Sequence, residues 1–226
     1  MANVYKITIA NQSGKQQRYA LFAEKPAVTG TPQEGLQHVF ATAHTASDQI
    51  AFIEIHRQYY AMCGLFESCP GRGVNVSVVE RREVTLGIVH MDGTQSPGTT
   101  LSMTVIDGVP QFRQEMTLKS AANAFEIDTD DSFTYEEAVK YNYAIGVGGP
   151  ARGGDTGAIF TFTPHPNTVY QLSPTNTFLV TATELEIGQL VDPSTLGKTV
   201  EVDFTKEVSG LAVIVHGVDD NLVIQH

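Results

Sequence analysis

The sequence has no tryptophan, only two cysteines and no run of 18 apolar residues among its 226 positions. Without such a run we expect no helix that crosses a bilayer, and two cysteines are too few for a fold that depends on disulfides. Basic residues are also scarce, because 14 Lys and Arg stand against 25 Asp and Glu, a net charge of −11. Such a surface repels phosphate groups, which argues against nucleic acid and membranes as partners.

The first residues, MANVYKITIANQSGKQQ, alternate apolar and polar side chains and lack the apolar core of a signal peptide. They predict a first strand and a cytoplasmic protein, and a secreted chain that has already been trimmed is the alternative. We expect free thiols at Cys63 and Cys69, as in a reducing compartment. No second cysteine pair and no histidine at ligand spacing accompanies them, so they do not predict a metal site.

Apolar residues recur mainly with a period of two, and β-branched residues are abundant, which indicates strands. The number and short spacing of the strands predict an all-β protein, an antiparallel β-sandwich that forms one unit over residues 1–226. Two packed lobes, about 1–120 and 121–226, are the alternative. The expected strands are 3–10, 17–23, 37–45, 49–60, 74–79, 83–91, 100–106, 110–118, 123–128, 142–147, 157–163, 177–184, 199–204 and 211–216.

Asp107-Gly108 is a favoured hairpin dipeptide between two alternating runs, so residues 100–106 and 110–118 are expected to pair. On the second strand the alternation predicts one face made of Phe112, Gln114, Met116 and Leu118, with the residues between them in water. One short helix is expected near residues 132–141, in DSFTYEEAVKYNY, capped by Asp131 or Ser132.

Two segments invite a ligand-binding interpretation. GVGGPARGGDTG, residues 146–157, is rich in glycine and would form a loop or lid, or an anion cradle with Arg152, but it lacks the phosphate-loop pattern. The acidic residues between 126 and 137 suggest calcium, yet Phe133 and Val139 occupy the positions of the EF-hand glycine and bidentate glutamate. A solvated helix start is favoured, and calcium in another kind of loop is the alternative.

The segment QIAFIEIHRQYY, residues 49–60, alternates strictly. As one strand it places Ala51, Ile53, Ile55, Arg57 and Tyr59 on one face, and the other face carries Ile50, Phe52, Glu54, His56, Gln58 and Tyr60. The first face begins as core. The polar end of the second face would either line a pocket with hydrogen-bonding groups or simply face water.

The sequence contains no recognisable motif for cofactor binding or covalent catalysis. The seven histidines form no metal-binding pattern, and His38 and His44 are about 20 Å apart along a regular strand. The sequence also lacks a GxSxG elbow and the dinucleotide-binding and kinase signatures. An enzyme with this sequence would most simply work without cofactor or metal, through an apolar pocket and a few hydrogen-bond donors.

The segments NQSGKQQRYALFAEKP, VFATA, QYYAMCG and YNYAIGVGG resemble a group of small fungal β-proteins, some of which accompany secondary-metabolite pathways. Within that group the chain is similar to the cofactor-free hetero-Diels–Alderases of tropolone sesquiterpenoid biosynthesis. The resemblance extends loosely over the whole chain and contains no diagnostic catalytic motif. It implies a cycloaddition between a tropolone quinone methide and an apolar terpene such as humulene.

Such a reaction needs two reactants held in one pose and a donor to the carbonyl oxygen. For catalysis we expect Tyr60, His56 and Arg57, with His56 as the proton-transfer group, and for substrate contacts Tyr143, Arg152 and Gln58. The partners would be apolar small molecules. A homodimer is expected because edge strands need cover. A lectin-like module that binds sugars through Tyr59, Tyr60 and the acidic stretch is the alternative, although the most suitable stacking ring, tryptophan, is missing. A structural protein without a ligand is the third possibility, and it would have no pocket of ligand size.

Overall fold

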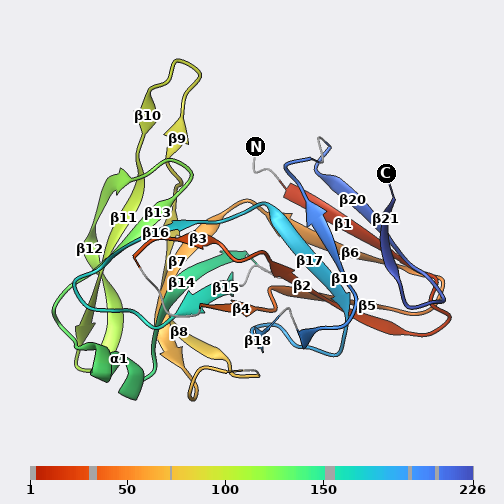
Figure 1. The fold of residues 1–226 in the computed structure, drawn as a ribbon, viewed down its shortest axis with the longest axis horizontal. Coiled ribbons are helices and arrows are strands. Elements are labelled where there is room, and N and C mark those ends of the chain that lie inside the picture. The colour runs from red at the N-terminus through yellow and green to blue at the C-terminus, as the bar shows by residue number, and fades with distance from the viewer. Residues whose placement is uncertain are drawn as a thin grey trace.

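The computed structural model describes residues 4–30, 35–71, 73–150, 156–192, 195–206 and 209–225. It is an all-β, sandwich-like fold with several antiparallel sheets and one short helix, α1 (Tyr135–Lys140), which confirms the predicted class. Figure 1 shows two lobes side by side and a narrow arm that projects from the left-hand lobe. In the described part of the chain no helix has the length and apolar character needed to cross a membrane.

The right-hand lobe of Figure 1 consists of two four-stranded sheets. Sheet A has the order β21 (Leu222–Gln225), β20 (Leu211–His216), β1 (Val4–Asn11) and β6 (Ile50–His56). Sheet B has the order β19 (Thr199–Asp203), β17 (Thr177–Ala182), β2 (Gln17–Ala23) and β5 (Ala41–Thr45). β1 and β20 run parallel, whereas their other neighbours run antiparallel. The buried hydroxyl of Tyr19 in sheet B lies 3.0 Å from Nδ1 of His216 in sheet A, so these sheets pack face to face.

The left-hand lobe contains two larger sheets and the arm. Sheet C has the order β12 (Val109–Ser120), β11 (Gly98–Ile106), β13 (Phe125–Thr129), β16 (Val169–Ser173) and β3 (Ala27–Val28). Sheet D has the order β18 (Leu190–Val191), β4 (Leu36–His38), β15 (Thr156–Phe162), β14 (Tyr143–Pro150), β7 (Tyr59–Phe66) and β8 (Val76–Val84). The arm is the hairpin β9 (Ile88–Val89) and β10 (Gln95–Ser96). Phe162 of sheet D meets Tyr170 of sheet C edge-on, with ring centroids 4.9 Å apart.

The two lobes do not correspond to residues 1–120 and 121–226. Lys6 of β1 pairs with Leu211 of β20, so the two ends of the chain share sheet A. β11 of the first range likewise pairs with β13 of the second. Buried residues from both lobes form one continuous cluster. The two lobes therefore share a core, and neither lobe is built from one half of the chain alone.

Residues 49–60 form two strands instead of the one expected. β6 ends at His56, and β7 begins at Tyr59 in a different sheet, so the chain crosses from one lobe to the other at Arg57-Gln58. Within β6 the predicted alternation is confirmed, with odd positions buried and even positions exposed. The even positions therefore form an outer sheet face, and the row from Glu54 to Tyr60 does not exist as one surface.

The hairpin at Asp107-Gly108 is confirmed, and both residues have positive φ, as its tight turn requires. The predicted inward face of β12 is wrong beyond Phe112, because Met116 and Leu118 are 56% and 58% exposed. β12 is an edge strand with an irregular register opposite Leu101–Met103, and such irregularities bend a strand. Its second half therefore lies outside the core.

The N-cap of α1 is Thr134 rather than the predicted Asp131 or Ser132. The Thr134 hydroxyl accepts a hydrogen bond from the Glu137 amide, while the Glu137 carboxylate accepts one from the Thr134 amide. Ser132 has a different task, because its hydroxyl accepts a hydrogen bond from the Val105 amide at 2.7 Å. The helix therefore begins later than the sequence pattern suggested.

The described ends of the glycine-rich segment 146–157 are strands, and the middle of the segment, residues 151–155, lies outside the described residues. Residues 146–150 belong to β14, and β15 begins at Thr156. Gly146 and Gly148 lie where neighbouring atoms leave no space for a side chain, which explains these glycines without a ligand. Arg152 lies outside the described residues.

Candidate functional site

An apolar pocket lies where the chain crosses between the lobes. Its polar wall is the crossing segment His56–Tyr59, and its apolar wall combines side chains from sheets A, B and D. Pro26 and Pro174 also line the pocket, each from a segment that connects two strands. The lining residues are Tyr5, Ala23, Glu24, Pro26, Phe40, Ile55, His56, Arg57, Gln58, Tyr59, Val147, Gly149, Ile159, Pro174, Thr175 and Phe178.

The pocket is nearly closed. The space within its walls is about 430 Å³ when the gaps between atoms and the open side are included, but the volume that a water molecule could occupy is only about 10 Å³. That room suits at most one water molecule, whereas pockets for small molecules measure roughly 300 Å³ or more. A ligand could therefore enter only if the segments that line the pocket moved apart.

Tyr59 supplies a half-buried hydrogen-bonding group to the pocket. Its hydroxyl donates to the Thr175 carbonyl oxygen at 3.4 Å. Burial raises the pKa of the Tyr59 phenol to about 12, although the nearby Arg57 acts in the opposite direction. The phenol therefore keeps its proton at neutral pH and can donate it in a hydrogen bond to a ligand oxygen.

Two aromatic rings pack next to the polar segment, one in contact with Arg57 and the other stacked on the first. The Arg57 guanidinium lies 5.4 Å from the centre of the Tyr5 ring. Tyr5 in turn stacks on Phe204 at a centroid distance of 4.2 Å, with the planes 3° apart. These contacts hold a permanent cation in the lining of an apolar pocket, where it would attract electron-rich oxygen atoms.

Of the predicted site residues that the structure describes, it brings three together and separates two. His56, Arg57 and Gln58 line the pocket. Tyr60 is not among the lining residues, and it pairs with Gly148 and Glu83 within sheet D. Tyr143 is buried in the core, edge-on to the Phe133 ring at 5.9 Å.

The sequence pattern predicted neither that Tyr59 lines the pocket nor which residues from distant parts of the chain form its walls. The alternation put Tyr59 on a core face and Tyr60 on the polar face, which holds only if the strand is continuous. The crossing at Arg57-Gln58 carries no glycine, proline or asparagine, so no turn signal marked it. Glu24, Pro174 and Phe178 join the site through sheet packing that a single sequence does not reveal.

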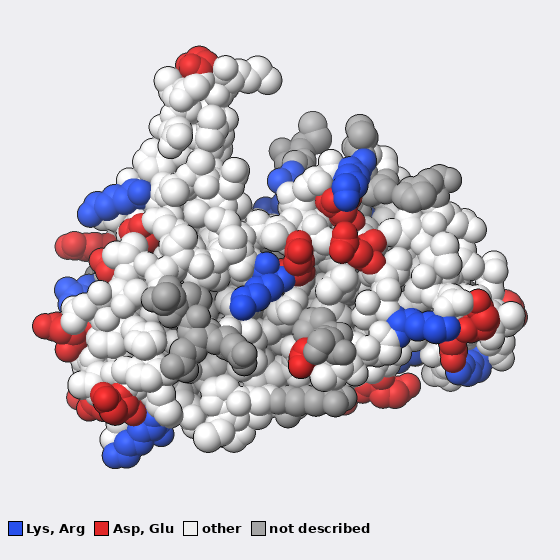
Figure 2. Space-filling model, viewed as in Figure 1, with Lys and Arg blue, Asp and Glu red and all other residues white. Residues whose placement is uncertain are grey.

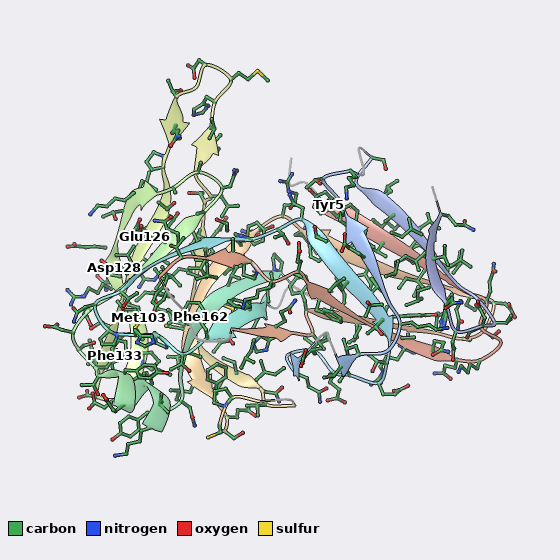
Figure 3. All side chains as sticks on the ribbon, in the orientation of Figure 1. Tyr5, Met103, Glu126, Asp128, Phe133 and Phe162 are labelled. Atoms are coloured by element: carbon green, nitrogen blue, oxygen red, sulfur yellow. The ribbon has the colours of Figure 1, made fainter. Side chains whose placement is uncertain are left out.

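A second, open cleft lies beside α1 and has a volume of about 610 Å³. One wall is a parallel stack of Tyr135 on His165, with ring centroids 4.0 Å apart and planes 3° apart. Asp131, Glu136 and Asn167 add polar groups to the lining. In Figure 3, Phe133, another lining residue, lies near α1 in the left-hand lobe, far from Tyr5, which lines the first pocket.

No metal centre is found in the described part of the chain, where no three His, Cys, Asp or Glu side chains converge. Glu126 and Asp128, labelled in Figure 3, are neighbours on β13, and the Glu126 carboxylate accepts a hydrogen bond from the Gln171 side chain. Cys63 is buried, Cys69 is exposed, and both are free. His38 and His216 are buried, and each has a neighbouring hydroxyl within hydrogen-bond distance of its ring.

Charged groups are spread over both lobes and gather at neither site. Figure 2 shows acidic and basic side chains interspersed on the visible face, while the projecting arm carries little charge below its acidic tip. The apolar pocket contributes one carboxylate, Glu24, and one guanidinium, Arg57. Its chemistry is therefore set by burial and hydrogen bonding rather than by a strong field.

Comparison with known proteins gives one family match. Searches among curated proteins and among solved structures return no similar protein. The sequence model of the RhiA family matches residues 2–226, which is nearly the whole chain. The chain therefore belongs to the RhiA family.

Proposed function

We propose that this protein is a pericyclase of natural-product metabolism that joins two apolar reactants in the pocket between its lobes. The observation that carries the proposal is the half-buried, protonated phenol of Tyr59 beside the cationic Arg57 in an apolar lining. The proposal requires that the lining segments move apart to admit both reactants, because the pocket as described holds at most one water molecule. The resemblance in sequence supplies the reaction class, a hetero-Diels–Alder addition of a quinone methide to an apolar terpene.

The reaction requires that the two reactants be held in one relative orientation and that one hydrogen-bond donor contact the quinone methide oxygen. One carbon–carbon and one carbon–oxygen bond form between the quinone methide and an alkene, and no atom, electron or leaving group is lost. Restricting both reactants to one pose lowers the entropic part of the barrier. A donor on the quinone methide oxygen stabilises the charge that builds up there. The reaction itself consumes no redox equivalent.

In this proposal each residue of the crossing segment has a role. Tyr59 donates to the carbonyl oxygen in place of the Thr175 carbonyl that it contacts in the closed form. Arg57 attracts the same oxygen, and Gln58 orients the ring. His56, at the rim, transfers a proton if water must leave a precursor first. The terpene would contact Phe40 and Ile159.

The test is to incubate the pure protein with a quinone-methide precursor and humulene and to follow the rate and stereochemistry of the product. We expect a faster reaction than in buffer and one predominant stereoisomer. Tyr59→Phe removes only the donor and should lower kcat/KM by about 100-fold, the usual effect of losing one such hydrogen bond. A matched control is Tyr141→Phe, since Tyr141 is exposed and does not line the pocket.

Two outcomes would decide against parts of the proposal. No acceleration together with a racemic product would remove the function. A loss of activity in Tyr60→Phe with full activity in Tyr59→Phe would move the donor to Tyr60. Gly149→Ala adds a further check on location, because its methyl group would lie 3.2 Å from Ile159 Cδ1 and narrow the pocket. We expect that variant to raise KM.

The cleft beside α1 favours a second candidate function, a carbohydrate-binding module. Stacked rings next to carboxylates and an amide are the groups that bind sugar faces and hydroxyls, and Tyr135, His165 and Asn167 provide them in an open cleft. Binding to a glycan array that disappears in Tyr135→Ala would support this candidate. Binding of apolar polycycles without any sugar binding would support the pericyclase.

A further inference from the structure

The outer face of sheet A is apolar although nothing in the described chain covers it. It consists of the outward side chains of four strands, which alternate with the buried ones. A sheet with one face in water normally carries polar residues on that face, and β19 of sheet B shows this with Thr199, Glu201 and Asp203. The outer face comprises Val4, Lys6, Thr8, Ala10, Ile50, Phe52, Glu54, His56, Leu211, Val213, Val215, Val223 and Gln225.

The exposed area on this face is continuous. Strand register aligns Ile50, Ala10, Val215 and Val223 in one row across the sheet, and Phe52, Thr8 and Val213 in the next. Ile50, Leu211 and Val223 are each more than half exposed. Apolar patches of this extent on soluble proteins mark interaction surfaces.

The charges on the outer face are self-complementary. Among its described residues only Lys6 and Glu54 carry a fixed charge, and they lie directly opposite each other on β1 and β6. The Lys6 ammonium lies 4.4 Å above the Phe52 ring, and the described contacts of Glu54 include no ion pair. A two-fold axis through the face would place Lys6 of each copy near Glu54 of the other.

A second copy of this chain is the occupant that these charges favour. The whole protein carries −11, so most relative orientations of two copies are repulsive, whereas this face is neutral. An anionic membrane would need a ring of cations that the face lacks. Four strands spaced about 4.8 Å apart and about 20 Å long give roughly 400 Å² of flat sheet. That size suits a small, reversible interface rather than an obligate one.

We propose that the protein forms a two-fold symmetric dimer through the outer face of sheet A, with Lys6 of each copy paired with Glu54 of the other. The two sheets would pack face to face, about 10 Å apart, as in a β-sandwich. The axis that this pairing requires runs between β1 and β6, so Phe52 would be buried against Thr8 of the other copy. The proposal does not depend on the activity proposed above.

The first test measures mass by sedimentation velocity between about 1 and 200 μM. We expect the wild type to change from monomer to dimer over this range, as small interfaces do. Phe52→Glu should raise the dissociation constant at least tenfold, because it buries an unpaired charge. Leu118→Glu is the matched control, since Leu118 is at least as exposed as Phe52 but lies on β12, and this variant should dimerise normally. Thermal unfolding checks that each variant is folded.

The second test separates contacts between copies from contacts within one copy. Lys6→Glu and Glu54→Lys each place like charges across the proposed interface, so each variant alone should remain monomeric. An equimolar mixture should form the heterodimer, because each contact between position 6 of one copy and position 54 of the other then joins a glutamate with a lysine. Mixing changes nothing within either copy, so the gain can come only from contacts between copies. Differently tagged copies and native mass spectrometry would record it.

A wild type that stays monomeric up to 200 μM would overturn the proposal. So would a dimer that Phe52→Glu leaves intact, because another surface would then hold it. A charge-variant mixture that forms no heterodimer would remove the Lys6–Glu54 pairing, and with it the argument for a second copy as the occupant.

Discussion

Replacing Gly146 by alanine should cost about 3 kcal/mol of unfolding free energy, as expected for severe overpacking. Gly146 lies in the centre of sheet D between Met62 and Thr161. A Cβ atom there would overlap the Phe160 carbonyl oxygen and lie 2.8 Å from the Thr161 Cα atom. Both contacts are with the backbone, so no side-chain rotation relieves them, and the two strands would have to separate.

The measurement is urea-induced unfolding of the wild type, Gly146→Ala and Gly197→Ala. Gly197 has no atom within 4 Å of its added Cβ position, so its alanine variant should stay within about 0.5 kcal/mol of the wild type or gain slightly from a stiffer unfolded chain. Equal transition midpoints for wild type and Gly146→Ala would show that β14 can yield at this point, contrary to the packing described.

Acidification should destabilise the protein through His38, by about 3 kcal/mol between pH 6.5 and pH 4. Burial lowers the pKa of His38 to about 4, although the hydrogen bond to the Gly188 carbonyl acts in the opposite direction. The ring donates from Nδ1 to that carbonyl at 2.9 Å and accepts at Nε2 from the Thr161 hydroxyl at 2.8 Å. Both bonds are those of the neutral ring.

The sign of this effect follows from proton uptake on unfolding. Between pH 6.5 and pH 4 the unfolded chain has His38 protonated and the folded chain does not, so falling pH favours the unfolded state. Above pH 6.5 both states are neutral and the stabilisation is complete.

Unfolding free energies at pH 7.5 and 4.5 for the wild type, His38→Gln and the exposed-site control His44→Gln would test this assignment. His38→Gln should be less stable at pH 7.5 but lose markedly less on acidification. An identical loss in all three proteins would assign the acid sensitivity to other groups.

The fold class could be predicted because its signals are local. Alternation with a period of two appears wherever a strand has one buried face, and β6 follows it at every residue. Asp107-Gly108 marks its hairpin because few other residues accept the positive φ that both positions adopt. One short helix and many strands could therefore be predicted without knowing which distant residues are in contact.

The site could be predicted only in part, for a physical reason. His56, Arg57 and Gln58 were predicted as neighbours in sequence, and neighbours in sequence remain close in any fold. The pocket itself is formed by residues as distant as Tyr5 and Phe178, and sheet order decides that juxtaposition. Tyr60 was favoured over Tyr59 because a continuous strand was assumed, and one break reversed which tyrosine faces the pocket. Met116 and Leu118 show the same dependence on tertiary structure, because their pattern is that of core residues while their position is at a sheet edge.

The parallel pairing of β1 with β20 sets the order in which the protein can assemble during synthesis. β20 leaves the ribosome about 200 residues after β1, a delay of about 10 to 40 s at ordinary elongation rates. Sheets C and D take most of their strands from the middle of the chain, so they can form while β1 and β6 still wait for their third partner. During that interval β1 exposes an unpaired edge, and a chaperone or a neighbouring nascent chain would compete for it.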